Sequence, residues 1–401
     1  MFFGQAASSV GDQLVIVALA LFIIRRTGSA SDLGFVLAAQ SLPLVGLVLL
    51  GGVWADRLPR HRLMIASDTV RALLHGLFAA LIFAGAIEVW QMAVIEALFG
   101  GARAFFQPAY SGLLPQTVPE AEIQAARALT ESANNVSVLV GPALGTALVL
   151  GVGAGEAFLV DAASFVLSAA LLVPVRPRVR GDAPAARESV LAELRGGWRE
   201  VRARAWVWAT IGAFAGALFC VYAQWYALAP LIARQDYGGA GWFGILEAIM
   251  GLGAVAAALV GVYWRPAHPL RTGLLLVLVW PVQSISFALV APLALVAPIT
   301  LATGFAFGLF IVWWETALAQ HVPPEALSRV SSYDWMGSLA LLPLGFAVAG
   351  PLAAGLGART VLGVGGVLGL VLLGLALLPR STRRLTEQLP RDVGVELGGE
   401  A

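Results

Sequence analysis

Two long apolar segments are joined by the short stretch Gly52-Val53-Trp54-Ala55-Asp56-Arg57-Leu58-Pro59-Arg60-His61-Arg62. The stretch holds one acid and three arginines, and each flanking segment is long enough to cross a bilayer. A connection this short needs glycine where helices approach, and its charges must stay in water. We therefore expect two membrane helices joined by a loop at one face of a membrane.

The composition of the whole chain excludes a soluble domain. Of its 401 residues, 59% are hydrophobic and 12% are charged, against about 25% charged in soluble domains. The chain has no lysine, which excludes a P-loop, and all 25 basic residues are arginine, which suggests a GC-rich bacterial genome. Its single cysteine, Cys220, excludes an intramolecular disulfide and a cysteine-based metal site.

Apolar runs of about 20 residues recur along the chain and predict an all-α integral membrane protein with twelve transmembrane helices. The expected spans, with approximate ends, are about 4–26, 32–54, 63–85, 88–110, 127–150, 156–175, 206–233, 240–263, 270–290, 294–318, 327–350 and 356–378. Eighteen arginines fall in one set of loops and the tail, and four at the opposite ends. By the positive-inside rule both termini are cytoplasmic, in a bacterial inner membrane.

The N-terminus is not expected to be a cleavable signal peptide. Met1-Phe2-Phe3-Gly4-Gln5 has no basic region before its apolar residues and quickly turns polar. It predicts a first helix that begins abruptly, so we expect the native chain to start a few residues upstream.

Weak internal repetition predicts two pseudo-symmetric six-helix bundles. A shift of 204 aligns Leu114, Gln116, Val118 and Pro119 with Leu318, Gln320, Val322 and Pro323. Shifts of 210 and 209 align the second span and the loop after it with later copies, in the same order. The expected domains are an N-terminal bundle at 1–175, a linker at 176–205, a C-terminal bundle at 206–379 and a cytoplasmic tail at 380–401.

The linker is expected to contain an amphipathic helix. Val190, Leu191, Leu194, Trp198 and Val201 recur at helical spacing among arginines. Such a helix lies with its apolar stripe in the lipid headgroups, or packs on the inner loops as a plain structural element.

The opening stretch resembles the signature G-x-x-x-D-R-x-x-R-R of the major facilitator superfamily, found between helices 2 and 3. Gly52, Asp56, Arg57, Arg60 and Arg62 fill this pattern. The resemblance implies an inner-gate latch, with the acid at a helix N-terminus of the opposite half and the arginines on helix-end carbonyls or carboxylates. The alternative is an ordinary cytoplasmic loop whose arginines only set orientation.

Two polar residues inside spans are candidates for proton coupling. Arg103, in a segment with Gln107, resembles the superfamily's helix-4 arginine, which is linked to proton coupling. A charge there is costly, so Arg103 either faces a cavity or snorkels to the inner surface. Asp12 lies at similar depth in the first span, in a stretch that resembles enterobactin-exporter and macrolide-efflux members. An Asp12–Arg103 pair would release the arginine when the acid is protonated; the alternative is a satisfied polar contact.

In the fifth span, Gly141-Pro142-Ala143-Leu144-Gly145 resembles the G-P-x-x-G signature of superfamily antiporters. Gly141 and Gly145 form a face on which helices approach closely, and Pro142 allows a bend. The resemblance implies export rather than uptake. Simple helix packing with a kink explains the same residues.

Further polar and aromatic residues are assigned to a substrate cavity or to structure. The expected cavity or coupling residues, besides those above, are Glu131, Gln224, Trp313, Trp314 and Glu315. Trp225 and Tyr226 belong either to the cavity or to an interfacial aromatic belt. Asp68 and Arg71, three residues apart, are expected to form a local pair. The four histidines show no metal-ligand spacing.

The resemblance implies a secondary active transporter that exports an amphipathic small molecule, such as a drug or siderophore, by proton antiport and alternating access. The expected partners are this small-molecule substrate, protons and the lipid bilayer, with the protein as a monomer. An importer or lysophospholipid translocator on the same fold is the alternative, followed by a receptor or a membrane enzyme. No catalytic motif, cofactor, metal site or nucleic-acid partner is expected.

Overall fold

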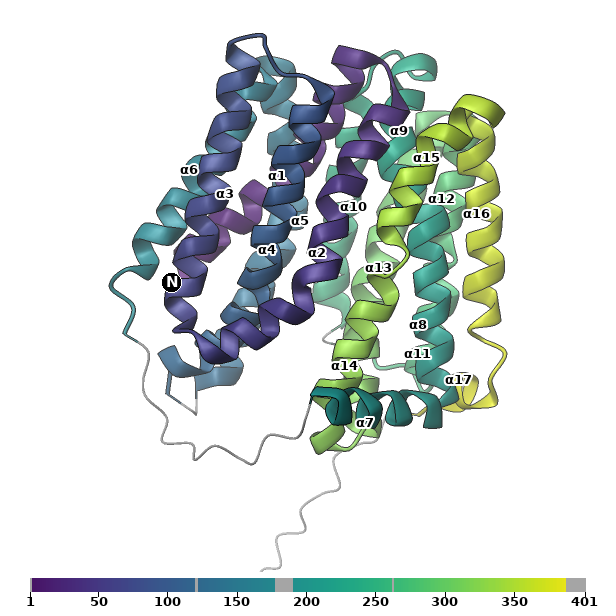
Figure 1. Ribbon diagram of the computed structural model, residues 1–401. Coiled ribbons are helices and arrows are strands. Elements are labelled where there is room, and N and C mark those ends of the chain that lie inside the picture. Colours follow the sequence, from purple (N-terminus) through teal and green to yellow (C-terminus); the bar gives the residue numbers. More distant parts are fainter. Residues whose placement is uncertain (1, 120–121, 177–189, 262, 387–401) are drawn as a thin grey trace, which may run out of the picture.

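The computed structural model describes residues 2–119, 122–176, 190–261 and 263–386 of the chain, and within these ranges its regular elements are helices (Figure 1). Eleven helical segments of the described part are long and apolar enough to cross a membrane. The twelfth span is α4 (Val89–Thr117), which has 29 residues and is made less apolar by Glu96 and Arg103. The twelve-helix membrane fold expected from the sequence is confirmed.

The N-terminal half consists of six helices, each continuous along its span. They are α1 (Phe2–Thr27), α2 (Ala30–Arg57), α3 (Arg60–Phe83), α4, α5 (Ile123–Gly151) and α6 (Ala154–Leu172). The turn from α1 to α2 shows how the sequence sets such boundaries. Gly28 has φ +67°, which favours glycine, and the Ser29 hydroxyl accepts a hydrogen bond from the backbone N–H of Asp32.

The C-terminal half contains three interrupted spans. Its helices are α8 (Ala205–Ala217), the π-helical turn Leu218–Tyr222, α9 (Ala223–Asp236), α10 (Gly241–Gly261), α11 (Pro269–Val277), α12 (Val279–Ala288), α13 (Leu293–His321), α14 (Pro324–Leu339), α15 (Leu342–Leu356) and α16 (Ala358–Leu375). Pro281 in α12 and Pro343 in α15 lie just after two of the interruptions. A proline lacks the N–H needed to continue the helix across each junction.

The two halves repeat one pattern of helix contacts. In the N-terminal half α2 packs on α4, α1 on α5 and α3 on α6; in the C-terminal half α10 packs on α13, α9 on α15 and α12 on α16. The contacts between halves are related in the same way, because α2 meets α15 and α5 meets α10. This pseudo-symmetry confirms the two bundles expected from the internal repeats.

Small residues allow the two halves to meet closely. A Cβ placed on Gly34 of α2 would lie 2.5 Å from the Phe346 carbonyl oxygen of α15. A Cβ on Gly251 of α10 would lie 2.5 Å from the Leu139 Cα atom of α5. We call this set of contacts the seam. It runs from the helix ends near Gly28 toward the middle of the spans, and we call that end of the molecule the joined end.

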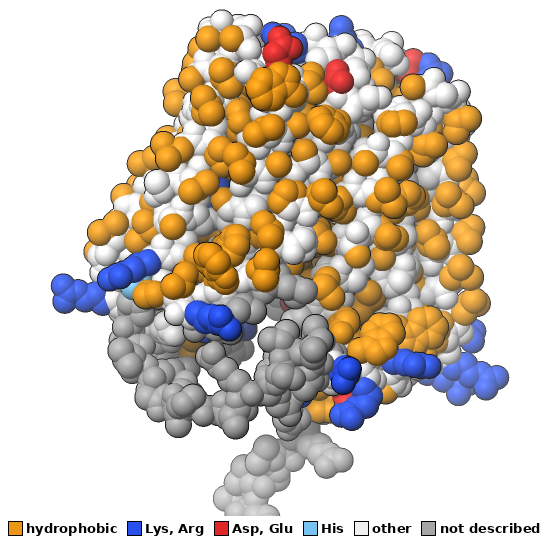
Figure 2. Space-filling view, in the orientation of Figure 1, with side chains coloured by type: hydrophobic (Ala, Val, Ile, Leu, Met, Phe, Trp, Pro, Cys, Tyr) orange, Lys and Arg blue, Asp and Glu red, His pale blue; other side chains and the backbone are white. Residues whose placement is uncertain are grey.

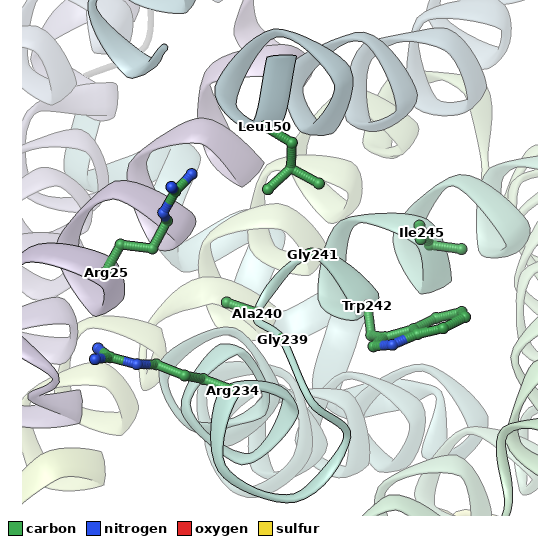
Figure 3. A pocket seen from close by; sticks show the side chains of 8 residues that line it. All are labelled: Arg25, Leu150, Arg234, Gly239, Ala240, Gly241, Trp242 and Ile245. Atoms are coloured by element: carbon green, nitrogen blue, oxygen red, sulfur yellow. The ribbon is translucent and has the colours of Figure 1, made fainter. Parts of the chain in front are cut away.

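Two arginines tie helices together at the joined end. Arg25 donates to the Val149 carbonyl at 3.2 Å, and Arg234 of the C-terminal half donates to the Ile24 carbonyl. Both line a surface hollow of about 410 Å³ together with Leu150 and Trp242 (Figure 3). Carbonyls at helix C-termini carry partial negative charge, so these arginines stabilise the ends of α1 and α5.

The outer wall of the protein is apolar, as a bilayer requires. Large hydrophobic side chains such as Leu73, Val166, Leu259 and Leu275 are exposed on it. Figure 2 shows hydrophobic side chains over most of this wall, with several arginines near its lower edge and a few arginines and acidic side chains at its upper edge. In a soluble protein such a surface would aggregate, whereas lipid tails cover it at no cost.

The linker helix α7 (Val190–Ala203) packs on the C-terminal half, at the end opposite the seam (Figure 1). Its Trp198 ring lies 5.9 Å from that of Tyr333 in α14, and Val201 is buried. The Glu200 carboxylate accepts a hydrogen bond from Arg204 at 2.6 Å, which lowers the pKa of Glu200. Of the two expected placements of this helix, packing on neighbouring elements is the one observed for these residues. The division at 176–205 stays a prediction, since residues 177–189 lie outside the described part.

The opening stretch of the sequence analysis is almost entirely helical, which corrects the expected loop. α2 continues through Arg57 and α3 starts at Arg60, so only Leu58 and Pro59 separate them. Polar residues at the end of a membrane helix can remain helical while reaching water. The charged residues of this stretch therefore do not indicate at which residue α2 ends and α3 begins.

Replacing Gly34 by alanine is expected to loosen the seam. The added Cβ must displace the α15 backbone, and overpacking of this kind costs about 1–3 kcal/mol. The matched control is Gly46→Ala on the same helix, where a Cβ meets nothing within 4 Å and helix propensity favours alanine. Thermal unfolding in detergent should show a lower midpoint for Gly34→Ala alone. Equal midpoints for the two variants would contradict the close approach.

Candidate proton-coupling site

One face of α3 carries three charged or ionisable residues into the interior of the N-terminal half. Asp68, Arg71 and His75 are spaced by three and four residues, so they share a face of the helix. Asp68 and His75 are fully buried, and Arg71 is 2% exposed. Charges at this depth in a membrane protein require partners.

Arg71 is held between two carboxylates and two aromatic rings. It forms an ion pair with Asp68, as the sequence predicts, and its Nη1 atom lies 3.7 Å from Oδ2 of Asp12 in α1. Its guanidinium carbon is 4.4 Å from the centre of the Phe106 ring and 4.2 Å from that of Phe165. A planar, delocalised cation can satisfy both kinds of neighbour at once.

His75 lies between two further carboxylates, each facing a different ring nitrogen. Nδ1 is 2.5 Å from Asp161 Oδ2 of α6, and Nε2 is 3.6 Å from Glu96 Oε1 of α4. Gln40 of α2 donates to the other oxygen of Glu96 at 2.5 Å. The imidazole also stacks on Phe99 with ring centres 4.0 Å apart. The ring is therefore fixed in position, with an acid at each end.

The backbone of α1 is shaped to admit Asp161. A Cβ on Gly11 would lie 2.1 Å from Asp161 Oδ1 and 2.7 Å from the Ser164 hydroxyl. A glycine at this position lets α1 pass directly beside the carboxylate. Because Gly11 precedes Asp12, the two acids approach each other from neighbouring helices.

These groups form two clusters within electrostatic range of each other, which we together call the polar network: Asp12, Arg71 and Asp68 in one, and Gln40, Glu96, His75 and Asp161 in the other. Asp12 is the most accessible charged member, with 17% of its side chain exposed. Chemically, the polar network offers carboxylates that can take up or release protons beside a permanent cation.

Arg103 does not pair with Asp12, which corrects the expected contact. Asp12 lies beside Arg71 instead, while Arg103 is half-buried on α4 and lies within electrostatic range of Tyr222 in the C-terminal half. Its expected position facing a cavity stays a prediction. Gln107, one turn further along α4, is exposed.

Several expected cavity residues lie inside the C-terminal bundle. Gln224 is buried and donates to the carbonyls of Phe219 and Gly345, so it pins helices together. Trp313 and Trp314 are buried, and Trp314 donates to Asp334 at 2.8 Å. Their expected role as cavity aromatics is not supported by these contacts. The side chain of Glu315 is exposed, and that of Glu131 lies outside the described part.

The C-terminal half has its own buried carboxylate, Glu247 of α10. Its two oxygens accept hydrogen bonds from Trp225 at 2.7 Å and Tyr226 at 2.5 Å. Both rings are buried, so the alternative of an interfacial belt is wrong for them. The two α9 side chains donate hydrogen bonds to Glu247, as a buried carboxylate requires.

The sequence profile of the Major Facilitator Superfamily matches residues 1–341, which is most of the chain. The chain belongs to the major facilitator superfamily. It is 28% identical over 370 residues to the multidrug efflux pump Tap of Mycolicibacterium fortuitum, covering 88% of both chains. It is 25% identical over 239 residues to macrolide efflux protein A of Streptococcus pyogenes, covering 59% of this chain and 58% of that one.

Solved structures of the superfamily share the fold at low identity. A bacterial homologue of the human lysosomal transporter Spinster, inward-facing and unoccupied, matches with a TM-score of 0.68 and 14% identity, covering 96% of this chain and 95% of that one. The nucleoside transporter NupG matches with a TM-score of 0.66 and 13% identity, covering 94% of this chain and 98% of that one. The relatives and neighbours are transporters, so this superfamily member is not an enzyme.

The superfamily's inner-gate signature lies at the end of α2 and the start of α3. Arg60 donates to the Gly112 carbonyl of α4 at 2.8 Å, which is a contact within its own half. Arg57 and Arg62 are exposed, and the surroundings of Gly52 and the side chain of Asp56 lie outside the described part. The expected contact of this stretch with the opposite half stays a prediction.

The antiporter-like signature of α5 packs on α1. A Cβ on Gly141 would lie 2.4 Å from the Gln13 Cβ atom, and one on Gly145 would lie 2.4 Å from the Leu14 carbonyl oxygen. The Thr146 hydroxyl donates a hydrogen bond to the Pro142 carbonyl, one turn earlier on α5, at 2.8 Å. These contacts hold α5 against the turn of α1 that follows Asp12.

Sequence reasoning missed most of the polar network. The sequence predicts the pairing of Asp68 with Arg71, but it shows nothing that distinguishes His75 from the other histidines and nothing that singles out Asp161. A signal was present in α3, because Asp68, Arg71 and His75 share one helical face in an otherwise apolar span. Their partners on α1, α4 and α6 are far away in the chain and follow only from the fold.

Removing the cation of the polar network is expected to destabilise the N-terminal half strongly. Arg71→Gln leaves Asp68 and Asp12 uncompensated, and breaking a buried ion pair in this way costs about 3–5 kcal/mol. The exposed Arg62→Gln is the matched control. Thermal unfolding should show a large loss for Arg71→Gln and partial recovery in Asp68→Asn/Arg71→Gln. A double variant no more stable than the single one would contradict the charge balance described here.

Proposed function

We propose that this superfamily member exports amphipathic small molecules by proton antiport, through alternating access between its two halves. The observation that carries the proposal is the Asp12–Arg71 ion pair, at 3.7 Å, between a partly exposed acid and a buried arginine. Protonation of Asp12 removes one of the charges that hold Arg71. A change of one proton therefore alters the interactions between α1 and α3.

The position of Asp12 supports a link between this proton and the seam. Side chains of both halves form a common buried core at the joined end, and on α1 that core begins at Leu14. Asp12 therefore lies at the margin of the region that must separate when the joined end opens. The α5 signature packs, through Gly141 and Gly145, on the turn of α1 that follows Asp12.

The orientation follows from the distribution of arginines. The end opposite the seam carries α7 and the signature arginines, while only Arg25, Arg26, Arg234 and Arg359 lie at the joined end. The positive-inside rule makes the α7 end cytoplasmic and places both termini there. In this reading the protein is closed toward the outside of a bacterial inner membrane and works as a monomer.

The direction and the substrate class are supported by the relatives. One is named a multidrug efflux pump and another a macrolide efflux protein. We expect an amphipathic compound to meet Arg103 and Tyr222, which come from opposite halves and lie within electrostatic range of each other. An importer or lysophospholipid translocator is the second candidate, because folds of this kind do not fix direction or substrate.

Proton antiport predicts substrate-dependent proton movement in liposomes with an imposed proton gradient. We expect macrolides, siderophores or lipophilic cations to change the lumen pH, measured with an enclosed dye. Asp12→Asn should abolish this change, because it cannot exchange a proton, and Arg103→Ala should weaken it. Asp32→Asn, at the joined end of α2, is the control for loss of an acid.

Transport that proceeds equally without the gradient and in Asp12→Asn would contradict proton antiport. Movement of substrate only toward the side that corresponds to the cytoplasm would contradict export. Exchange of lysophospholipid in place of the drug panel would favour the second candidate.

A further inference from the structure

We propose that His75, Asp161 and Glu96 form a buried proton-binding site, distinct from Asp12, that carries one proton in the conformation described here. The three side chains come from α3, α6 and α4 of the N-terminal half. This inference rests on the proposed function for its role in transport, but the binding of the proton itself does not depend on transport.

The charge balance of the polar network requires protons. The network contains four carboxyl groups: Asp12 from α1 and Asp68 from α3 lie beside Arg71, and Glu96 from α4 and Asp161 from α6 lie beside His75. The permanent cation among them is Arg71, and α2 contributes the neutral Gln40. Even with an imidazolium at His75, ionised carboxylates would outnumber cations by two. Burying such an excess is so costly that groups of this kind bind protons instead.

The geometry around His75 selects it as the place where a proton is held. Both ring nitrogens face a carboxylate, Nδ1 at 2.5 Å from Asp161 and Nε2 at 3.6 Å from Glu96. A neutral imidazole has one N–H and can donate in only one direction, whereas the imidazolium donates in both. Glu96 Oε1 and His75 Nε2 are buried and have no hydrogen-bond partner among the described residues. With Asp161 and Glu96 both ionised, the protonated ring is the form that can donate toward both acids.

A proton fits this site better than a metal ion does. The two carboxylates lie at opposite ends of one imidazole, so their oxygens do not converge on a common point. The stacked Phe99 and the edge of Phe158, with ring centres 4.0 Å and 5.3 Å from His75, cover the ring with apolar surface. Binding forms one N–H bond on the ring and consumes one proton from water. Release breaks that bond and returns the proton to water.

The polar network supplies a connection between this site and the surface. Asp12 and Arg71 lie within electrostatic range of Asp161, and Asp12 is partly exposed. Gly11 brings α1 against Asp161 itself. A change in the protonation of Asp12 therefore alters the electrostatic field at Asp161, the partner of His75, and a movement of α1 displaces Asp12 and the Gly11 backbone beside Asp161 together.

The direct test uses the small number of histidines in this chain. The chain has four, so His61→Gln/His268→Gln/His321→Gln leaves His75 as the only histidine. Nuclear magnetic resonance of this variant with ¹⁵N-labelled histidine, in lipid nanodiscs, reports whether each ring nitrogen carries a proton. We expect both to be protonated at pH 7. Adding Asp161→Asn should lower the proton affinity of His75 by about tenfold or more, since one pKa unit corresponds to one such factor, whereas Asp32→Asn should leave it unchanged.

A neutral His75 ring at pH 7 in the single-histidine protein would overturn the proposal, and so would a signal that does not respond to Asp161→Asn. If Asp161→Asn fails to fold, Glu96→Gln tests the opposite side of the ring in the same experiment. In the liposome assay, His75→Gln should lose gradient-driven transport while His321→Gln keeps it. If His75 is protonated but the protein moves no protons with its substrate, proton antiport is refuted and this site is not. If the protein moves protons with its substrate but His75 is neutral, this site is refuted and proton antiport is not.

Discussion

The N-terminal half of this protein is built around the need to compensate charge where water is scarce. Arg71 cannot lose its proton, so Asp68 and Asp12 must be close to it, and the aromatic rings of Phe106 and Phe165 complete its surroundings. This requirement fixes how α3 faces α1 and α6. It also leaves the remaining acids, Glu96 and Asp161, to share His75. One buried arginine thus determines the arrangement of four helices.

The two halves use their polar residues differently although their helices pack alike. In the N-terminal half the buried acids lie beside cations and an imidazole. In the C-terminal half Glu247 and Asp334 are met by the neutral donors Trp225, Tyr226 and Trp314. Protonating a carboxylate that is held by neutral donors breaks no ion pair. Protonating a carboxylate that lies beside a cation does break one. This asymmetry favours the N-terminal half as the place where protons act.

The fold could be predicted from the sequence because each span is long and apolar, and because two sets of helices repeat in order. The amphipathic spacing of residues 190–201 likewise predicted α7. Local contacts such as Asp68–Arg71 were foreseeable, since a helix brings residues three apart together. The pairing of His75 with Asp161, 86 residues away, could not be predicted, because it depends on α3 packing on α6 and on the missing side chain of Gly11. The Asp12–Arg103 pair failed for the same reason: depth in the membrane does not tell which helix lies beside α1.

The seam combines glycines set against backbone atoms of the opposite half, as at Gly34 and Phe346 or Gly251 and Leu139, with an apolar core that both halves share. Such contacts are held by dispersion forces and shape, which ionic strength and pH leave almost unchanged. Acidifying the outer medium therefore offers little direct leverage on the joined end. In the proposed mechanism a proton therefore binds within one bundle, and it affects the contact between the halves by displacing whole helices.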